Sequence, residues 1–182
     1  MPSILSHPAI PLAIGIGLGS RVISARLLVT GVACSMLPDL DVYLGAFVAA
    51  IDHRGVTHSL VFALTCAAIA SGLAPSLDTR RLTAFWFIAV ITASHGLLDA
   101  CTNGGSGILL LWPFSNDRYF MPWQVIEVSP LGVSAFLSQR GLEVLASELK
   151  WVWPPAFALG FALYGLRRTA LQRPLARIDD KS

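Results

Sequence analysis

Residues 82–101 read LTAFWFIAVITASHGLLDAC, a run of 20 mostly apolar residues with a histidine and an aspartate near its end. About 20 such residues are enough for one helix to cross the hydrocarbon core of a bilayer. The whole chain is similar in character, because 54% of its 182 residues are hydrophobic and 13% are charged, against roughly 25% charged residues in an ordinary soluble domain. The sequence therefore predicts a membrane protein in which this run forms a spanning helix.

Other apolar runs lie on both sides of this one. Residues 59–77 form a second run of spanning length, and residues 151–166 form another that opens with two tryptophans, which favour a membrane interface. Residues 8–20 and 27–37 are each too short to span, so a shallow or tilted hairpin is expected there. Together these runs predict an all-α fold, a compact helical membrane bundle of about four to six short helices.

Two further segments differ in composition. Residues 102–130 are rich in glycine, proline and aromatic residues, and they predict an irregular loop. Residues 131–149 predict an amphipathic helix that has Glu143, Glu148 and Lys150 on its wet side.

One domain is expected over residues 1–170, followed by a polar tail over 171–182, because no repeat with a period of about 20 to 50 residues is visible. Cys34, Cys66 and Cys101 stand far apart in apolar surroundings, so they predict buried side chains rather than a disulfide framework or a zinc knuckle. The net charge of +2 is small and the basic residues are scattered, so no nucleic-acid partner is expected. The N-terminal run lacks the basic region and cleavage site of a signal peptide.

All four histidines of the chain fall at the ends of apolar segments, and acidic residues accompany them. His95 and Asp99 are four residues apart, which places both side chains on one face of a helix. His53 and His58 are five apart with Gly55 between them, so at least one of them is expected on the turn before its helix. This arrangement predicts a site built across helix ends. The ionisable residues concerned are His7, Asp39, Asp41, Asp52, His53, His58, His95 and Asp99.

Each of these residues taken singly also has a structural explanation. The His95–Asp99 pair can be a satisfied hydrogen bond, the DLD of residues 39–41 a solvated turn or helix cap, and Arg54 an interfacial cation. Their conjunction favours a functional site, because ionisable groups at membrane depth are costly and mark such sites by default. Imidazoles and carboxylates together suit zinc, manganese or iron. The sequence therefore predicts a divalent metal, with zinc as the first candidate.

Five motifs give the chain a family resemblance. They are SH at 6–7, LPDLD at 37–41, HRGVTHSL at 53–60, SHGLLDACTNGG at 94–105 and LLLWPFSNDRYFMP at 109–122. In this order they resemble the YdjM-type family of inner-membrane metal-dependent hydrolases, and more distantly the helical zinc-dependent phospholipases C and single-strand nucleases. The resemblance implies metal-ligand roles for His7, Asp39, His53, His58, His95 and Asp99. One position departs from the pattern: family members often carry a histidine directly after the second aspartate of PDxD, and Val42 stands there instead.

A metal bound by these residues supports hydrolysis, because it lowers the pKa of a coordinated water from 15.7 toward about 7 and polarises the substrate oxygen. The ligands are numerous enough for one to three ions, and a pair of ions suits displacement at a phosphodiester. Arg54 is expected to hold an anionic group of the substrate, and Asp41 or Asp52 to act as general base or as partner of a histidine. A membrane site with this arginine favours a lipid-linked phosphoester, with membrane lipids as partners.

Two other classes of protein fit the same residues. A membrane metal or proton transporter would place its ligands near the bilayer midplane on broken helices, whereas these ligands gather at helix ends. A structural membrane protein stapled by a closed metal site is the second alternative.

The basic residues predict the orientation in the membrane. Arg21 and Arg26 lie between the first two runs, Arg80 and Arg81 lie between the third and fourth, and further arginines follow the last run. If each run crosses once, all these clusters lie on one side, which the positive-inside rule makes cytoplasmic. We therefore expect a multi-pass protein of the inner (plasma) membrane whose metal site opens on the periplasmic face.

Overall fold

The run at 82–101 forms the central helix of the molecule. A computed structural model describes residues 1–42 and 53–172. Within these residues the structure is helical and has no β-strand, which confirms the all-α prediction. The elements are α1 (Ala9–Leu18), α2 (Ala25–Met36), η1 (Leu37–Leu40), η2 (Val56–His58), α4 (Leu60–Gly72), α5 (Arg81–Ala100), α6 (Val133–Phe136), α7 (Gln139–Trp151) and α8 (Trp153–Gln172), where η denotes a 3₁₀ helix.

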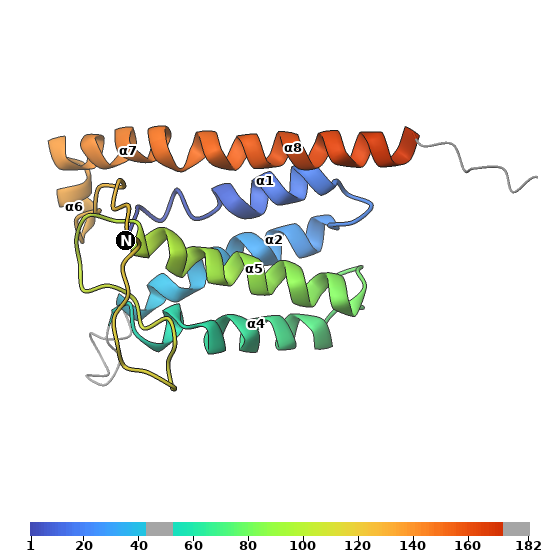
Figure 1. Ribbon diagram of the computed structural model, residues 1–182, viewed down its shortest axis with the longest axis horizontal. Coiled ribbons are helices and arrows are strands. Elements are labelled where there is room, and N and C mark those ends of the chain that lie inside the picture. The colour runs from blue at the N-terminus through green and yellow to red at the C-terminus, as the bar shows by residue number, and fades with distance from the viewer. Residues whose placement is uncertain (43–52, 173–182) are drawn as a thin grey trace, which may run out of the picture.

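Helix α5 packs against α2 and α4 in the middle of a bundle of roughly parallel or antiparallel helices (Figure 1). The core at this junction is aliphatic, and Leu27, Ile88 and Ile91 have no solvent-accessible surface. This packing holds α5 rigidly along its length. It therefore fixes the direction of the polar side chains that α5 carries near its C-terminal end.

Small residues bring α1 and α8 close together. Ala13 and Ala156 are buried where the two helices meet. A Cβ atom at Gly17 would lie 2.7 Å from the carbonyl oxygen of Gly160, and one at Gly160 would lie 3.0 Å from that of Ala13. Contacts between small residues spaced four apart are typical of helix pairs in lipid, where packing rather than exclusion of water drives association.

The helix ends are set by local side chains. Ser24 and Ser59 cap α2 and α4 by accepting hydrogen bonds of 3.1 Å from the backbone N–H groups of Leu27 and Phe62. Helix α4 ends at Gly72 and is followed by turns, so the prediction of one spanning run over 59–77 is wrong. After the helix, Ala74 and Leu77 pack against the aliphatic core instead of prolonging α4.

The loop at 102–130 matches its prediction, whereas the amphipathic segment at 131–149 matches its prediction only in part. Residues 102–130 contain no helix or strand and are held by isolated bridges such as Ile108 to Tyr119, as an irregular loop predicts. The expected helix over 131–149 is divided into α6 and α7. The division occurs because the side chain of Ser138 accepts a bond from the N–H of Arg140 and starts a new helix.

Glu148 does not face water, and the prediction that it does is wrong. Its exposed fraction is 1%. One carboxylate oxygen accepts a hydrogen bond from the hydroxyl of Ser3 at 2.7 Å, and the other accepts one from the backbone N–H of Ser3. Glu148 thus ties the N-terminal segment to α7, and this segment leads into His7.

The two ends of the bundle are chemically different. Arg26, at the start of α2, pairs with Asp78 in the α4–α5 turn at 3.0 Å. The guanidinium of Arg167 on α8 lies against Gly19 in the α1–α2 turn. The basic turns therefore meet at one end. The irregular loop, η1 and η2 lie at the opposite end (Figure 1).

Large apolar side chains are exposed along the helices between these ends. Val29 on α2, Leu82 and Trp86 on α5, and Phe161 on α8 have exposed fractions between 61% and 74%. Of the helices in the described residues, α5 is the one that is long and apolar enough to cross a membrane. Helices α1 and α4 are apolar but shorter, so several full crossings are not borne out by helix length.

Candidate metal centre

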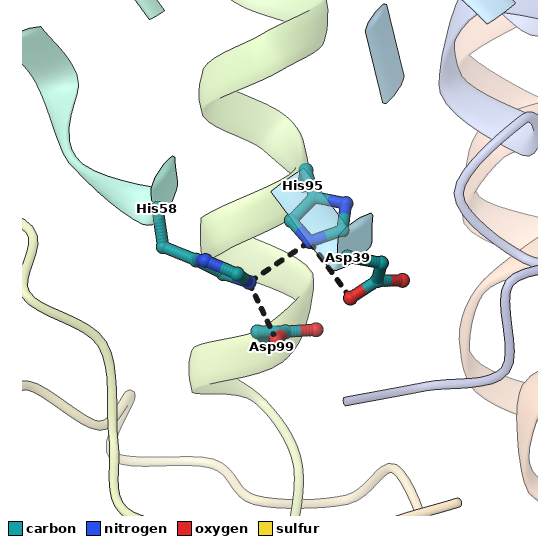
Figure 2. A group of neighbouring side chains, drawn as sticks. All are labelled: Asp39, His58, His95 and Asp99. Carbon is teal, nitrogen blue, oxygen red and sulfur yellow. Dashed lines mark hydrogen bonds and ion pairs between the residues drawn. The ribbon is translucent and has the colours of Figure 1, made fainter. Parts of the chain in front are cut away.

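Four ionisable side chains converge at the end of the bundle opposite the basic turns. Asp39 comes from η1, His58 from η2, and His95 and Asp99 from the last turns of α5 (Figure 2). Each residue offers one nitrogen or oxygen, and these four atoms all lie within 4.8 Å of one another. None of the four residues is more than 3% exposed. The structure therefore gathers residues separated by up to 60 positions into one buried group that could hold a metal ion, and we call this group the metal centre.

Local sequence explains how each ligand reaches the metal centre. His95 and Asp99 share a face of α5 because they are four residues apart. Pro38 opens η1 and turns the chain after α2, which brings Asp39 inward. Gly96 leaves room for η2, since a Cβ atom there would lie 3.0 Å from the carbonyl oxygen of His58.

The Nδ1 atoms of His58 and His95 each face a hydrogen-bond acceptor. Nδ1 of His95 lies 2.7 Å from the carbonyl oxygen of Ser35. Nδ1 of His58 lies 3.3 Å from Oδ2 of Asp41 and 3.0 Å from the hydroxyl of Thr57. Protons on both Nδ1 atoms leave lone pairs on both Nε2 atoms. Those two Nε2 atoms face each other at 3.0 Å, so a cation or a proton is needed between them.

The carboxylates of the metal centre also lack hydrogen bonds. Both oxygens of Asp39, both oxygens of Asp99 and both nitrogens of His7 are buried without a hydrogen-bond partner. An unpaired buried polar group costs about 1 to 3 kcal/mol, and more when it is charged. Several in one place fit a divalent cation, and mixed imidazole and carboxylate donors suit zinc, manganese or iron.

The pKa values of His58 and His7 are shifted in opposite directions. Burial disfavours the imidazolium of His58, but its close contacts with the carboxylates of Asp41 and Asp99 and their negative charges outweigh burial and raise its pKa to about 9. Burial and the neighbouring His95 lower the pKa of His7 to about 3. For Asp41 burial acts to raise the pKa, yet hydrogen bonds from His53 and His58 hold it well below its usual value.

Asp41 lies behind His58 rather than among the four converging atoms. Its Oδ2 accepts hydrogen bonds from the hydroxyl of Thr57 at 2.8 Å and from the backbone N–H of Arg54 at 3.1 Å. Nδ1 of His53 lies 2.7 Å from the other oxygen, and the side chain of His53 is 30% exposed. The structure thus places Asp41 as a support for His58 and His53 at the margin of the site. Asp52 lies outside the described residues.

Arg54 is buried, at 1% exposure, and each nitrogen of its guanidinium faces a polar group of the protein. Nε lies 3.3 Å from Oδ2 of Asp99, Nη2 donates to the hydroxyl of Thr102 at 2.9 Å, and Nη1 donates to the carbonyl oxygen of Gly104 at 2.9 Å. A left-handed backbone at Arg54, with φ of 61°, turns the side chain inward. These contacts orient Asp99. The sequence had instead predicted that Arg54 holds an anionic group of the substrate.

Four residues that support the metal centre were not identified from the sequence. The carbonyl oxygen of Ser35 carries no side-chain signal, so nothing in the sequence could have indicated it. Thr102 and Gly104 belong to the motif at 94–105, and their polarity directly after an apolar helix is a usable signal. In the sequence Glu148 resembles an exposed acidic residue of a helix, and only its contact with Ser3 in the structure shows its role.

The comparisons with known proteins agree with the motifs. A model described as YdjM inner membrane protein matches residues 1–172. The inner membrane protein YbcI of Escherichia coli strain K12 is 44% identical over 173 residues, covering 92% of this chain and 100% of that protein. The chain belongs to the YdjM family. No solved structure matches it.

Membership of the YdjM family identifies the chain as an inner membrane protein. The exposed apolar surface of the helices agrees with that location. Every motif of the resemblance falls within the matched residues, so the metal centre belongs to the part of the chain that the YdjM family defines. The names of the family and of the relative describe a location and no reaction.

In this YdjM family protein a cavity of about 430 Å³ adjoins the metal centre. Asp39 lies in its wall, and most of the remaining wall is apolar. The N-terminal segment contributes Ile4 and Leu5, while residues 129–136 contribute Leu131 and Val133. These four side chains are also 40% to 76% exposed, so the cavity opens among apolar surface.

Proposed function

We propose that this protein is a metal-dependent hydrolase of the inner membrane that cleaves a phosphoester or similar bond in a lipid-linked substrate. One observation carries the proposal. The Nε2 atoms of His58 and His95 face each other at 3.0 Å beside two carboxylates that have no hydrogen-bond partner. Such a group is costly to bury with neither a cation nor a proton between its members, and its donors match the ligand set of a zinc site.

The residues have separate parts in this proposal. His58, His95, Asp39 and Asp99 would hold a divalent ion, with zinc as the first candidate and manganese or iron as alternatives. Such an ion supplies a water of lowered pKa and polarises the substrate oxygen. Asp41 keeps the Nδ1 proton of His58, so that Nε2 points to the ion.

The remaining polar residues position this set. Ser35 keeps the Nδ1 proton of His95. Arg54 offsets the charge of Asp99 and fixes its direction. Because its guanidinium is already engaged by Thr102 and Gly104, we assign Arg54 to the metal centre rather than to the substrate.

The cavity beside Asp39 supports a substrate with an apolar chain. Its wall combines one metal-centre carboxylate with the side chains of Ile4, Leu5, Leu131 and Val133. A lipid chain in this cavity would bring its polar head group to Asp39. The exposed apolar rim would let the chain enter directly from the bilayer, which favours a lipid-linked substrate over a water-soluble one.

Metal analysis and a hydrolysis screen on the purified protein test the proposal. We expect bound divalent metal, and hydrolysis of a phosphodiester lipid in mixed micelles that exceeds hydrolysis of its short-chain, water-soluble analogue. Asp99→Asn should lose both metal and activity. Asp117→Asn, which changes an exposed aspartate in the loop, is the matched control and should keep both. Hydrolysis that persists in Asp99→Asn after chelation would sink the idea.

A metal-stapled structural protein is the second candidate, because all four ligands are at most 3% exposed and a closed site is typical of structural metals. It predicts bound metal and a fall in thermal stability on chelation, without hydrolysis of any lipid ester in the screen. A transporter is disfavoured, because the ligands lie at the end of the bundle opposite the basic turns rather than midway along it.

We further propose that the chain crosses the membrane several times, with the metal centre toward the periplasm. The basic turns lie together at one end, and short basic loops stay cytoplasmic. Asp99 is 18 residues beyond Arg81 on the same helix, about 27 Å at 1.5 Å per residue. Cysteines at Asn103 and at Ser76, in a cysteine-free background, test this with an impermeant thiol reagent on intact cells. Asn103→Cys should react and Ser76→Cys should not, and the opposite pattern would reverse the orientation.

A further inference from the structure

We propose that the metal centre holds two divalent ions, bridged by the carboxylates of Asp39 and Asp99, with His7 as the terminal ligand of the second ion. This inference rests on the proposed metal centre and extends it. The four-residue group already described omits His7, and the observations below concern the space between His7 and the two carboxylates.

Each carboxylate divides its two oxygens between different histidines. Oδ1 of Asp39 lies 3.4 Å from Nε2 of His95, while Oδ2 lies 3.6 Å from Nε2 of His7. Asp99 repeats the pattern: Oδ2 lies 3.2 Å from Nε2 of His58, and Oδ1 lies 3.8 Å from Nε2 of His7. Two carboxylates that each present one oxygen to either side form a pair of bridges between two ion positions.

The distances from Nε2 of His7 to the two carboxylates fit coordination of the same ion better than a direct hydrogen bond. Two ligands of one tetrahedral ion, each about 2.1 Å from it, are separated by about 3.4 Å. The separations of 3.6 Å and 3.8 Å are close to this value. They exceed the roughly 2.7 to 3.2 Å of a hydrogen bond, so a simple imidazolium bound between two aspartates does not explain the geometry.

The surroundings of His7 also indicate that its ring binds a cation. The residue is 1% exposed, and neither of its ring nitrogens has a hydrogen-bond partner. A histidine that served only the core would satisfy at least one of them. Its ring instead stacks on that of His95, with centroids 3.8 Å apart and planes 20° apart, which fixes where Nε2 points.

The segment that carries His7 is held in place from outside the centre. Ser3 is bound by Glu148 through its backbone and its hydroxyl, and the N–H of Ser129 donates to the carbonyl oxygen of Met1 at 2.9 Å. The position of His7 is therefore set before any ion arrives. A preorganised ligand of this kind loses little entropy on binding.

The two positions differ in their ligand sets. His58, His95 and one oxygen from each aspartate complete four ligands for the first ion. His7 and the other two oxygens give three for the second, which leaves a position open for water or substrate, as in catalytic sites. A pair of ions that share such an opening can stabilise both the attacking and the leaving oxygen of a phosphoester.

Metal stoichiometry of the full-length protein in detergent tests the proposal. The protein is stripped with a chelator, reloaded with Mn²⁺ and measured by elemental analysis and by electron paramagnetic resonance. We expect two ions per chain and the signal of a magnetically coupled pair. His7→Asn should bind one ion and show an uncoupled signal. Asp117→Asn should behave as the unchanged protein.

The outcomes separate this inference from the proposed function. One uncoupled ion in both the unchanged protein and His7→Asn would overturn the second ion and leave the hydrolase proposal standing. No ion in the unchanged protein would overturn both. Two coupled ions retained in His7→Asn would overturn the role of His7. If His7→Asn fails to fold, the coupled or uncoupled signal of the unchanged protein alone decides whether the second ion exists.

Discussion

The two ends of the bundle treat charged side chains in opposite ways. At the basic end, Arg26 and Asp78 form an ion pair of 3.0 Å whose side chains are 66% and 62% exposed. At the other end, Asp99 and Arg54 face each other at 3.3 Å with side chains 0% and 1% exposed. An exposed pair is worth about 0 to 1 kcal/mol, whereas a buried charge must be compensated fully. In the function that we propose, the exposed charges orient the protein in the membrane and the buried charges bind the metal.

The largest expected effect comes from replacing a ligand of the metal centre. His95→Ala removes the Nε2 atom that faces His58, so metal affinity should fall by more than about 100-fold, beyond the 10- to 100-fold typical of supporting residues. Arg26→Ala at the basic end should leave metal affinity unchanged. Competition titrations with a coloured chelator measure both. An equal loss of metal affinity in the two variants would contradict the conclusion that only one end of the bundle binds metal.

Removing the buried cation should have the next largest effect. Arg54→Ala removes one charge partner of Asp99 and leaves His58 as the other, so it should cost up to about 3 to 5 kcal/mol of stability in the metal-free protein. Arg54→Lys keeps the charge but loses the bonds to Thr102 and Gly104, so its loss should be smaller. Thermal unfolding in detergent, with chelator present, ranks the two. A metal-free Arg54→Ala as stable as the unchanged protein would contradict the role given to Arg54.

Metal binding should depend on pH in a direction that the site determines. The pKa of His58, raised to about 9 by Asp41 and Asp99 against the effect of burial, keeps it protonated at neutral pH in the metal-free protein. An ion can bind Nε2 only after that proton leaves, so apparent affinity should rise about tenfold per pH unit from pH 7 and level off above about 9. Calorimetry in buffers of different ionisation enthalpy should detect close to one released proton at pH 7. Uptake of protons, or none released, would refute this assignment.

The smallest effect concerns two glutamates on α7. Glu148→Gln weakens the bonds that hold Ser3 and should destabilise the protein by about 1 kcal/mol. Glu143→Gln changes an exposed pair with Arg140 and should be close to neutral. Thermal unfolding compares the two variants directly. A larger loss in Glu143→Gln would show that burial does not govern the value of charge in this bundle.

Length and apolar composition were enough to predict the central helix. The run at 82–101 became α5, at Arg81–Ala100, because a helix that is apolar on every side can pack against other helices on one side and face lipid on the other, with its backbone hydrogen bonds satisfied internally. The shared face of His95 and Asp99 followed from helical spacing alone. The family followed from motifs that are local in the sequence, and the comparisons confirmed it.

Turns and packing decided the rest. His7, near the N-terminus, reached the metal centre, because Glu148 on a distant helix holds its segment there. His53, five residues from His58, lies at the margin, because the turn that directs His58 inward leaves His53 partly exposed. Arg54 turned inward through its left-handed backbone. Sequence fixes side-chain direction only within a regular helix, and beyond its end the direction depends on contacts between segments far apart in the chain.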